Sequence, residues 1–418
     1  MQTKSVIQVF EHEWLLFNDY KELQKRHIDA LLQFNDNHHN KYLQVGRKGV
    51  KFRQYVGVLQ VGNITIEILP KTDNSGDKNK WRDVLLKMLK ECRLLKTEYL
   101  DHAFLQLRSN SLLEIYLGLF LNRVERLVHE GLIKKYAKWE GNQLTLKGQL
   151  LFGKNISNNF VHQERFYVRY TEYSYTNCLN QLLYKTLHLF PLMTNNPNLL
   201  NGANRLLLHF PEMPDCKVNE STFEKLVFDR KSERYKEALT ISKMLLLNFW
   251  PDIKGGAENV IAILFDMNKL WEEFVFRRLQ RAADAGTIVT RQQKKFWYNN
   301  SMGKYKWVIP DIVVQRGGRT VILDTKWKII KDNTPSDDDL KQMFVYNLFF
   351  NAERSYLVYP GSNETSSGSY LHFDLSYPKR RNDDEEFYNH CSLLFLDLLN
   401  EEGKLVGVEV FDRLLKKI

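Results

Sequence analysis

Long apolar runs and paired cysteines are both missing from this sequence. No stretch of the 418 residues is apolar and long enough to cross a bilayer, and the first residues lack the apolar segment of a secretory signal. The four cysteines lie far apart and form no CxxC pair, which argues against a disulfide framework and against a cysteine zinc site. We therefore expect a cytoplasmic protein that has reduced thiols and does not enter a membrane.

The sequence also lacks the short motifs of several enzyme classes. It has no GxxxxGK[ST] motif, so we do not expect the chain itself to bind and hydrolyse a nucleotide as a P-loop motor. None of its 11 histidines lies in HExxH spacing, and no GxSxG elbow indicates a Ser-His-Asp hydrolase. Any chemistry therefore rests on other side chains.

The composition is that of a soluble globular protein with an excess of positive charge. Hydrophobic residues make up 43% of the chain and charged residues 26%, and the length allows more than one hydrophobic core. The 60 Lys and Arg residues outnumber the 50 Asp and Glu residues, which gives a formal net charge of +10. Such a charge favours encounter with a polyanion such as nucleic acid, but it does not specify one.

Residues 42–70 show the alternation that is typical of β-strands. Apolar side chains recur at every second position in two runs, and Gly62-Asn63 lies between the runs as a turn. We predict antiparallel strands in a small β-rich unit. The unit begins with four basic residues that either form a solvated strand face or contact DNA or a partner protein: Arg47, Lys48, Lys51 and Arg53.

Helical spacing dominates the middle of the chain. Ser111 and Gly131 are suited to cap the two ends of one long apolar helix. We expect two strands that turn at Glu140-Gly141-Asn142. The other segments with helical periodicity are residues 81–95, 170–191 and 233–250.

Two apolar strands in the C-terminal part carry the candidate catalytic residues. The strands and the tight turn between them are residues 308–314, residues 320–328 and Gly317-Gly318. Asp324 and Lys326 point to the same face of one strand, and Asp311 lies on its neighbour. Burying two carboxylates and an ammonium group is costly unless they pair or bind a cation. Carboxylate oxygens of this kind suit Mg²⁺.

A predicted helix upstream, in the segment VIAILFDMNKLWEEFVFRRLQRA, offers a third carboxylate. Glu272 has apolar neighbours three, four and seven residues later, whereas the neighbours of Glu273 are more polar. A carboxylate within an apolar stripe needs a metal ion or a lysine nearby. Glu272 is therefore the candidate and Glu273 its surface neighbour, with a surface salt bridge as the alternative role for either residue.

A helix that follows the hairpin is predicted from its N-terminal cap. Ser336 can cap it, and the three aspartates that come next complement the helix dipole, so we interpret them as structural. Gln342 and Tyr346 lie four residues apart on one face of this helix. Further expected elements are strands at residues 356–359 and 370–375, a helix near residues 385–399 and, at Lys379-Arg380-Arg381, a solvated loop or a phosphate contact.

These residues carry a resemblance to a known nuclease family. The order Pro310-Asp311, twelve residues, Asp324-Thr325-Lys326 resembles the PD-(D/E)xK nuclease core. With the flanking segments FDMNKLWEEFVFRRL, ILDTKWK and Gln342-Met343-x-x-Tyr346, the sequence resembles the McrC family, the nuclease subunit of McrBC-type, 5-methylcytosine-directed restriction systems. VGVLQVGNITIEILPK near the N-terminus and GLIKKY…LTLKGQLLFGKNI in the middle are similar to the same family.

The resemblance implies roles for named residues. Asp311, Asp324 and Glu272 would hold one or two Mg²⁺ ions. Lys326 would orient the attacking water, and Gln342 would border the active site. The implied substrate is DNA that contains methylcytosine, and the implied partner is a McrB-like AAA+ GTPase hexamer whose GTP hydrolysis the N-terminal part stimulates. No short motif identifies the stimulating residue.

The implied fold class is α/β of the α+β type, in three parts. Residues 1–156 would form an N-terminal β-rich, partner-docking domain with helices. Residues 157–256 would form a mainly helical connecting region. Residues 257–418 would form a PD-(D/E)xK restriction-endonuclease-like α/β core.

Two other functions stay open. The chain could be a non-catalytic adaptor that bridges a AAA+ ring to DNA, although an adaptor would not need Asp311, Asp324 and Lys326 together. It could also be a self-sufficient nuclease, although the sequence shows no recognisable base-reading module. An autonomous enzyme would cut DNA with Mg²⁺ alone, whereas a subunit would need the GTPase and GTP.

Overall fold

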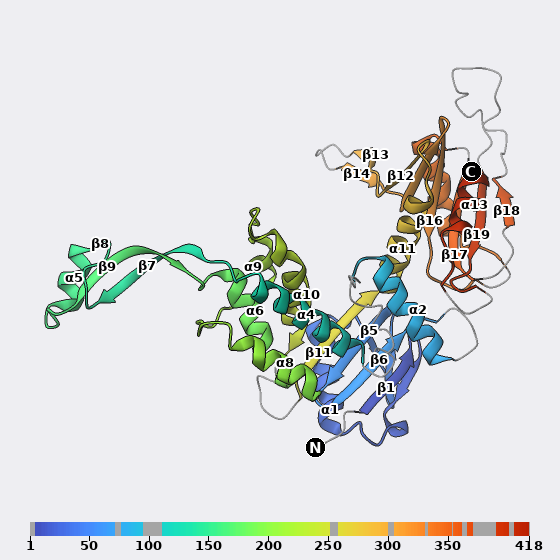
Figure 1. Cartoon of the computed structure of the whole chain (residues 1–418). Helices are drawn as coiled ribbons and strands as arrows, with labels where there is room; N and C mark the ends of the chain where they lie inside the picture. Colours follow the sequence, from blue (N-terminus) through green and yellow to red (C-terminus); the bar gives the residue numbers. More distant parts are fainter. Residues whose placement is uncertain are drawn as a thin grey trace.

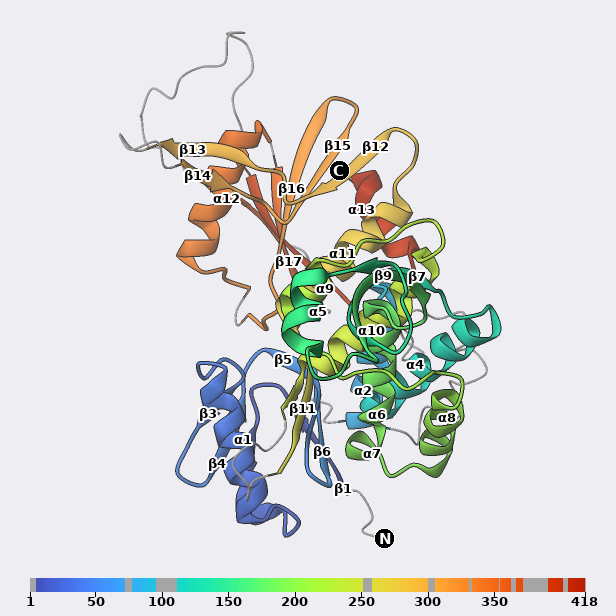
Figure 2. The ribbon, with the colours of Figure 1, turned by 90° about the vertical axis from the view of Figure 1, so that its left-hand side faces the viewer.

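The computed structural model describes residues 5–71, 77–94, 111–250, 258–299, 305–330, 333–352, 354–361, 366–370, 390–400 and 405–417. The protein is a mixed α/β protein, as the sequence predicts. Two large sheets and a group of helices are visible in Figures 1 and 2, and a long arm projects from the helices in Figure 1. Within the described ranges, none of the helices is both long and apolar enough to span a membrane.

A five-stranded sheet forms the N-terminal part. Its strands, in spatial order, are β1 (Ser5–Phe10), β6 (Ile64–Leu69), β5 (Tyr55–Val61), β11 (Val260–Asp266) and β10 (Phe249–Trp250). The antiparallel pairing of β5 with β6, around Gly62 at φ +56°, confirms the predicted strands. β11 pairs with β5 along its whole length, so the strand that leads into the predicted nuclease core lies in the N-terminal sheet.

Both faces of this sheet are buried. Its apolar side chains alternate between two cores, one under α1 (Lys25–Asn37) and the other under α2 (Lys78–Glu91). α2 confirms the helix predicted near residues 81–95. The remaining elements of this part are a short 3-10 helix, η1 (Phe17–Asp19), and a three-stranded sheet in the order β2 (Trp14–Leu16), β4 (Gly49–Phe52) and β3 (Leu43–Val45).

A group of helices follows in the middle of the chain and shares a hydrophobic core with the N-terminal sheet. They are α4 (Leu112–His129), α6 (Cys178–His188), α7 (Phe190–Met193), α8 (Pro197–Leu207), α9 (Glu220–Glu224), the 3-10 helix η2 (Glu233–Tyr235) and α10 (Lys236–Leu247). Both predicted caps of α4 are confirmed. The Ser111 hydroxyl accepts a hydrogen bond from the Glu114 backbone N–H at 3.3 Å, and Gly131 follows the helix with φ +83°.

A long arm projects from the helical region (Figure 1). It consists of β7 (Lys135–Gln143), β8 (Gln149–Leu150), α5 (Phe152–Asn159) and β9 (Phe166–Ser174). The turn predicted at Glu140-Gly141-Asn142 was wrong, because β7 runs through these residues and pairs with β9. A Cβ on Gly141 would lie 2.7 Å from the Trp139 ring, so the glycine makes room for this ring. The helix predicted from Tyr170 was also wrong at its start, since β9 continues to Ser174.

A six-stranded sheet forms the C-terminal part. Its strands, in spatial order, are β12 (Thr287–Arg291), β15 (Ile312–Arg316), β16 (Arg319–Thr325), β17 (Arg354–Pro360), β19 (His390–Leu396) and β18 (Ser366–Ser369). α11 (Met267–Ala282) and α13 (Glu409–Lys417) contribute to the core on one face, and α12 (Asp337–Phe350) to the core on the other. β13 (Lys295–Asn299) and β14 (Tyr305–Val308) form a separate two-stranded hairpin beside it. One hydrophobic core extends from the N-terminal sheet through the helices to this sheet.

Several expectations for this part were wrong in their boundaries or type. The strand predicted over residues 308–314 is interrupted between β14 and β15, because Pro310 has no N–H for a strand ladder. The following strand ends at Thr325 rather than at residue 328. Instead of the helix expected near residues 385–399, residues 390–396 form the buried strand β19. The strand predicted at residues 356–359 is confirmed by β17. The predictions for residues 371–375 and 379–381 lie outside the described residues.

Candidate active site

The β15–β16 hairpin places two aspartates opposite each other. Gly317 and Gly318 form its turn with φ of +55° and +80°, conformations that favour glycine, which confirms the predicted turn. Ile312 pairs with Leu323 in the antiparallel ladder. The next position on each strand therefore brings Asp311 and Asp324 together at the open end of the hairpin.

Asp311 is held in place by the neighbouring strand. Its Oδ2 accepts hydrogen bonds from the Thr325 backbone N–H at 2.7 Å and from the Thr325 hydroxyl at 2.8 Å. The backbone carbonyl of Asp311 accepts a further hydrogen bond from the Gln292 N–H at 3.0 Å. Hydrogen bonds to a carboxylate are short and directional, so they fix the orientation of this side chain.

Asp324 and Lys326 form an ion pair on one face, as the strand alternation predicts. Asp324 is 2% exposed, and its Oδ2 lies 2.7 Å from Lys326 Nζ, although the two atoms are not aligned as a hydrogen bond. Burial, followed by the negative charge of Asp311, raises the pKa of Asp324 to about 7 in spite of the lysine. Two carboxylates that repel each other in a buried site favour a bound cation.

Lys326 also contacts helix α12. Its Nζ donates a hydrogen bond to Gln342 Oε1 at 3.0 Å and lies 3.3 Å from Asp339 Oδ1. Burial disfavours the charge of Lys326, but the neighbouring carboxylates outweigh burial and raise its pKa, so the amine stays protonated. Gln342 donates to the Tyr346 hydroxyl at 2.6 Å, and this hydroxyl donates to the Ile309 carbonyl at 2.9 Å. The resulting chain of hydrogen bonds connects Lys326 to the backbone just before Asp311.

Asp339 lies close to Lys326, although the sequence indicated only a structural role for it, in which it complements the dipole of the helix. The predicted cap is confirmed, since Ser336 Oγ accepts a hydrogen bond from the Asp339 N–H at 3.3 Å. The Asp339 carboxylate, however, also pairs with Lys328 at 2.6 Å and with Lys326. The alternation of Lys326 and Lys328 after Asp324 was the available signal that a further carboxylate would face this strand end.

The adjacent glutamates of α11 have different surroundings. Gln292 Nε2 donates to Glu272 Oε1 at 3.1 Å. Burial, followed by the negative charge of Asp311, raises the pKa of Glu272. Glu273 instead pairs with Arg277 at 2.5 Å and with a second arginine at the end of β12. The negative charge of Glu272 is therefore close enough to interact with that of Asp311.

Two tryptophans support these residues. Trp271 precedes Glu272, Trp327 follows Lys326, and the centroids of the two indole rings lie 5.6 Å apart. The Trp271 indole N–H and the Lys326 backbone N–H both donate to the carbonyl of Val358, at 3.2 Å and 2.9 Å. This shared acceptor fixes α11 relative to the end of β16.

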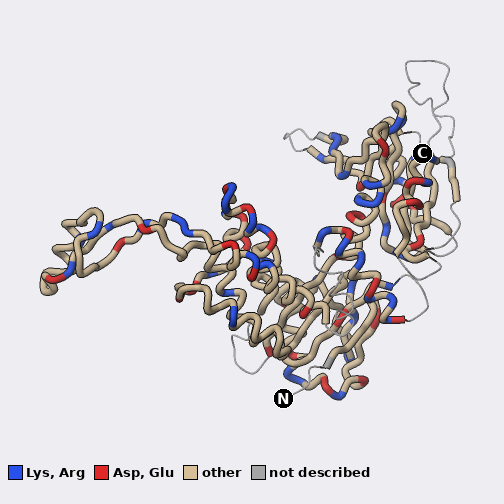
Figure 3. Tube along the Cα trace, viewed as in Figure 1, with Lys and Arg blue, Asp and Glu red and all other residues tan. Residues whose placement is uncertain are grey.

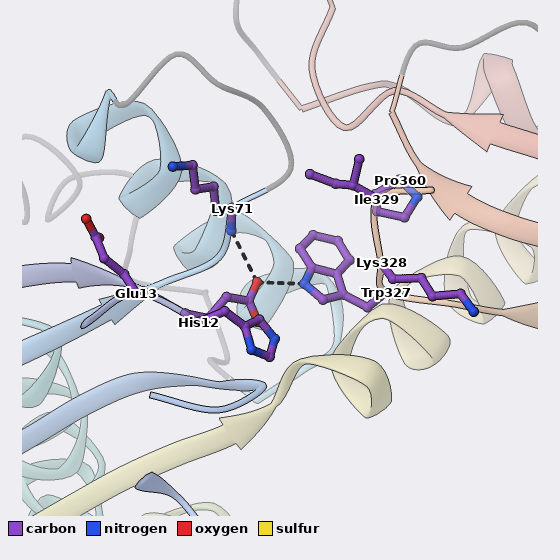
Figure 4. A pocket seen from close by; sticks show the side chains of 8 residues that line it. His12, Glu13, Lys71, Trp327, Lys328, Ile329 and Pro360 are labelled. Carbon is purple, nitrogen blue, oxygen red and sulfur yellow. Dashed lines mark hydrogen bonds and ion pairs between the residues drawn. The ribbon is translucent and has the colours of Figure 1, made fainter. Parts of the chain in front are cut away.

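Glu11 follows β1 in the N-terminal sheet and contacts Trp327. Its partners Trp327 and Lys71 are labelled in Figure 4. Its Oε1 accepts the Trp327 indole N–H at 2.6 Å and the Lys71 backbone N–H at 3.2 Å. Its Oε2 is buried and has no hydrogen-bond partner among the described residues, with His12 Nε2 4.0 Å away. Burial outweighs the two hydrogen bonds and raises the pKa of Glu11 to about 7. Sequence reasoning missed Glu11, because no local pattern connects it to Trp327.

The predicted metal requires carboxylate ligands that lie close together. Across the described parts of the chain, no three His, Cys, Asp or Glu side chains gather closely enough to form a metal-binding cluster, so Glu272 does not complete such a cluster with the aspartates. Asp311 and Asp324 nevertheless fit Mg²⁺, which keeps several waters and takes one or two protein carboxylates. The raised pKa of Asp324 reflects a repulsion that a divalent cation would relieve.

The fold and the site together define a mixed α/β protein with a carboxylate pair and a protonated lysine at the end of a β-hairpin. A family model described as McrBC 5-methylcytosine restriction system component matches residues 50–360, and the chain belongs to this family. The family match confirms the resemblance that the sequence motifs indicated.

Two solved structures from Thermococcus gammatolerans are similar to this chain. One is described as a half-complex from a tetradecameric assembly of McrB AAA+ hexamers with bound McrC; the match has 22% identity and a TM-score of 0.70, and it covers 99% of this chain and 100% of that chain. The other is a cryo-EM structure of the McrBC complex, with 24% identity, a TM-score of 0.51 and coverage of 67% of this chain and 89% of that chain. At these identities the likeness shows a shared fold. No curated protein matches the chain.

Proposed function

We propose that this chain is the Mg²⁺-dependent endonuclease subunit of a McrBC-type, modification-dependent restriction system in the cytoplasm. It hydrolyses phosphodiester bonds of methylcytosine-containing DNA when it is assembled with a McrB-like AAA+ GTPase hexamer. The observation that carries the proposal is the convergence of Asp311, Asp324 and Lys326 at one end of the β15–β16 hairpin. Membership of the McrBC family supports the proposal, and the six-stranded C-terminal sheet is the part of the chain that we assign to the PD-(D/E)xK core.

In this proposal Asp311 and Asp324 hold Mg²⁺, and Glu272 adds negative charge beside them. The bound metal would lower the pKa of a coordinated water and offset the charge that develops on the phosphate. Lys326 is protonated, so it orients the water or the phosphate oxygen rather than removing a proton. Gln342 accepts a hydrogen bond from Lys326 and thereby holds the amine beside Asp324.

The arm is the surface that we assign to contact with the proposed GTPase partner. It projects away from both sheets (Figure 1), and an exposed apolar patch of this kind is typical of a protein interface. Six apolar side chains on the arm are 60–83% exposed: Leu144, Leu146, Phe152, Ile156, Phe160 and Val161. The arm and the N-terminal sheet would dock on the GTPase ring and stimulate its GTP hydrolysis.

The test is cleavage of methylated and unmethylated plasmid with Mg²⁺, with and without the candidate GTPase and GTP. Asp324→Ala should reduce cutting by about a hundredfold or more, because it removes a proposed metal ligand. It should retain partner binding and GTPase stimulation. Asp338→Ala is the matched control, since Asp338 is an exposed aspartate in the first turn of α12 and should cut like wild type.

Each alternative function has its own outcome. Undiminished cutting by Asp324→Ala would contradict the nuclease site and favour a non-catalytic adaptor. Full cutting by the wild-type chain with Mg²⁺ alone would instead identify a self-sufficient nuclease. Dependence of cutting on both the GTPase and GTP supports the subunit.

A further inference from the structure

The β13–β14 hairpin exposes an unusual number of aromatic rings. Each of its five aromatic side chains is about half exposed, whereas large aromatic side chains in soluble proteins are usually mostly buried. They are Phe296 at 54%, Trp297 at 51%, Tyr298 at 53%, Tyr305 at 53% and Trp307 at 44%. Contiguous exposed apolar surface of this kind marks a binding site.

The hairpin orders part of this surface before any ligand binds. Phe296 packs against Trp307 with ring centroids 3.8 Å apart and against Tyr305 with centroids 4.9 Å apart. The strand register shifts between Phe296 and Tyr298, so Trp297 lies at a β-bulge. Bulges re-aim side chains and often occur next to active sites. The hairpin therefore presents pre-positioned rings, which lowers the entropy cost of contacting a ligand.

The charge of the hairpin has a single sign. No Asp or Glu occurs between Arg291 and Asp311, a stretch that contains four lysines: Lys294, Lys295, Lys304 and Lys306. Residues 37–66 likewise hold basic residues and no acidic ones, whereas over most of the trace Lys and Arg are mixed with Asp and Glu (Figure 3). Aromatic rings interleaved with lysines suit a polyanion that also offers flat, stackable groups, which describes DNA.

The hairpin is anchored beside the candidate active site. Lys295 Nζ donates to the Phe349 carbonyl at 2.9 Å and lies 4.7 Å from the centroid of the Phe350 ring, both on α12. The other strand, β14, ends at Val308, and the chain reaches Asp311 three residues later. A DNA backbone bound at Asp311 would therefore pass along this hairpin.

We propose that the β13–β14 hairpin is a DNA-contacting element that places its aromatic rings against the bases beside the phosphodiester bond that is cut. It partly unstacks a base step there and holds the backbone over Asp311 and Asp324, as apolar wedges do in other DNA-binding proteins. The contact is independent of sequence, because every base presents a π-face. This inference rests on the proposed nuclease function and adds the surface that holds its substrate.

The test uses the full chain and a fluorescein-labelled DNA duplex in EDTA, so that binding is measured without cutting. Trp297→Ala combined with Tyr298→Ala should weaken binding by about fivefold or more and should abolish the permanganate reactivity of thymines that unstacking produces. The single variant Trp297→Phe, which keeps an aromatic ring at this position, should retain most of the DNA binding and most of the permanganate reactivity of wild type. Trp14→Ala is the matched control, because Trp14 is a comparably exposed tryptophan, at 43%, on β2 of the N-terminal part.

Equal binding and equal permanganate reactivity for wild type and the double variant, with unchanged melting temperatures, would overturn the inference. The proposed function fails separately. If wild type cuts no DNA under any condition but its binding still depends on Trp297 and Tyr298, the hairpin contacts DNA and the nuclease assignment is wrong. If wild type cuts and the double variant binds normally, only the hairpin inference is wrong.

Discussion

The buried Glu11 carboxylate makes a quantitative prediction about stability and pH. Burial raises its pKa from 4.5 to about 7 in the folded chain, whereas in the unfolded chain it titrates at its ordinary value. Between these values the folded state binds a proton that the unfolded state has lost. The stability contribution is therefore present below pH 4.5 and is lost as the pH rises through about 7. At about 1.4 kcal/mol per pH unit, the loss amounts to about 3 kcal/mol.

Glu11→Gln removes this titration while it keeps an oxygen that can accept the Trp327 indole N–H. The new amide leaves a buried N–H₂ where Oε2 had no partner among the described residues, which adds a cost of about 1–3 kcal/mol that does not depend on pH. The informative quantity is therefore the pH slope of the stability difference. Asp324 also has a raised pKa, but its contribution is the same in both proteins and cancels.

The assay is thermal unfolding of wild type and Glu11→Gln from pH 5 to pH 8, with His12→Gln as a control for the exposed neighbouring side chain. Relative to Glu11→Gln, wild type should lose roughly 3 °C in melting temperature over this interval, because the unfolding entropy of a chain of this length is large. Parallel melting curves for the two proteins at every pH would refute the reasoning, because Glu11 would then titrate alike in the folded and unfolded chain.

Three further predictions concern the site and the arm. Lys326→Met should reduce cutting by about a hundredfold or more. It should also lower the melting temperature more at pH 8 than at pH 5, because it leaves Asp324 buried without its ion-pair partner. Mg²⁺ should raise the melting temperature of wild type and not of Asp324→Ala; an equal rise in both would exclude this metal site. Tyr235→Phe should destabilise the base of the arm by about 1–3 kcal/mol of folding free energy, because the hydroxyl that accepts a hydrogen bond from the Ile133 N–H at 2.9 Å is lost. The variant should then stimulate GTP hydrolysis less than wild type does, with DNA binding unchanged.

Local chemistry explains which parts of the fold the sequence could predict. The Gly317-Gly318 turn, the Ser111 and Ser336 caps and the alternation that puts Asp324 and Lys326 on one face each depend on residues only a few positions apart. Their geometry is fixed by backbone sterics and short-range hydrogen bonds, which are the same in any context. These features agree with the structure for that reason.

Tertiary pairing decided the parts that the sequence predicted wrongly. Glu140-Gly141-Asn142 has the composition of a turn. Gly141 instead lies in β7, which pairs with β9, and its lack of a side chain leaves room for the Trp139 ring. The apolar run of β19 suits a helix as well as a buried strand, and only its parallel pairing with β17 determines the outcome. A single sequence contains the signals of both alternatives and not the partner strand that selects one.

Glu11 is the site residue that sequence reasoning missed because its partner is distant in the chain. Trp327 and Glu11 are separated by 316 positions, yet their hydrogen bond lies one residue from Lys326. The Trp327 ring also contacts the ring of Trp271, the residue that precedes Glu272. Separating the N-terminal sheet from the C-terminal sheet would leave the indole and the carboxylate without their hydrogen bond, at a cost of about 1–3 kcal/mol for each group that stays buried. The proposed docking sheet and the proposed catalytic side chains are therefore held in one relative position by contacts through the two tryptophan rings.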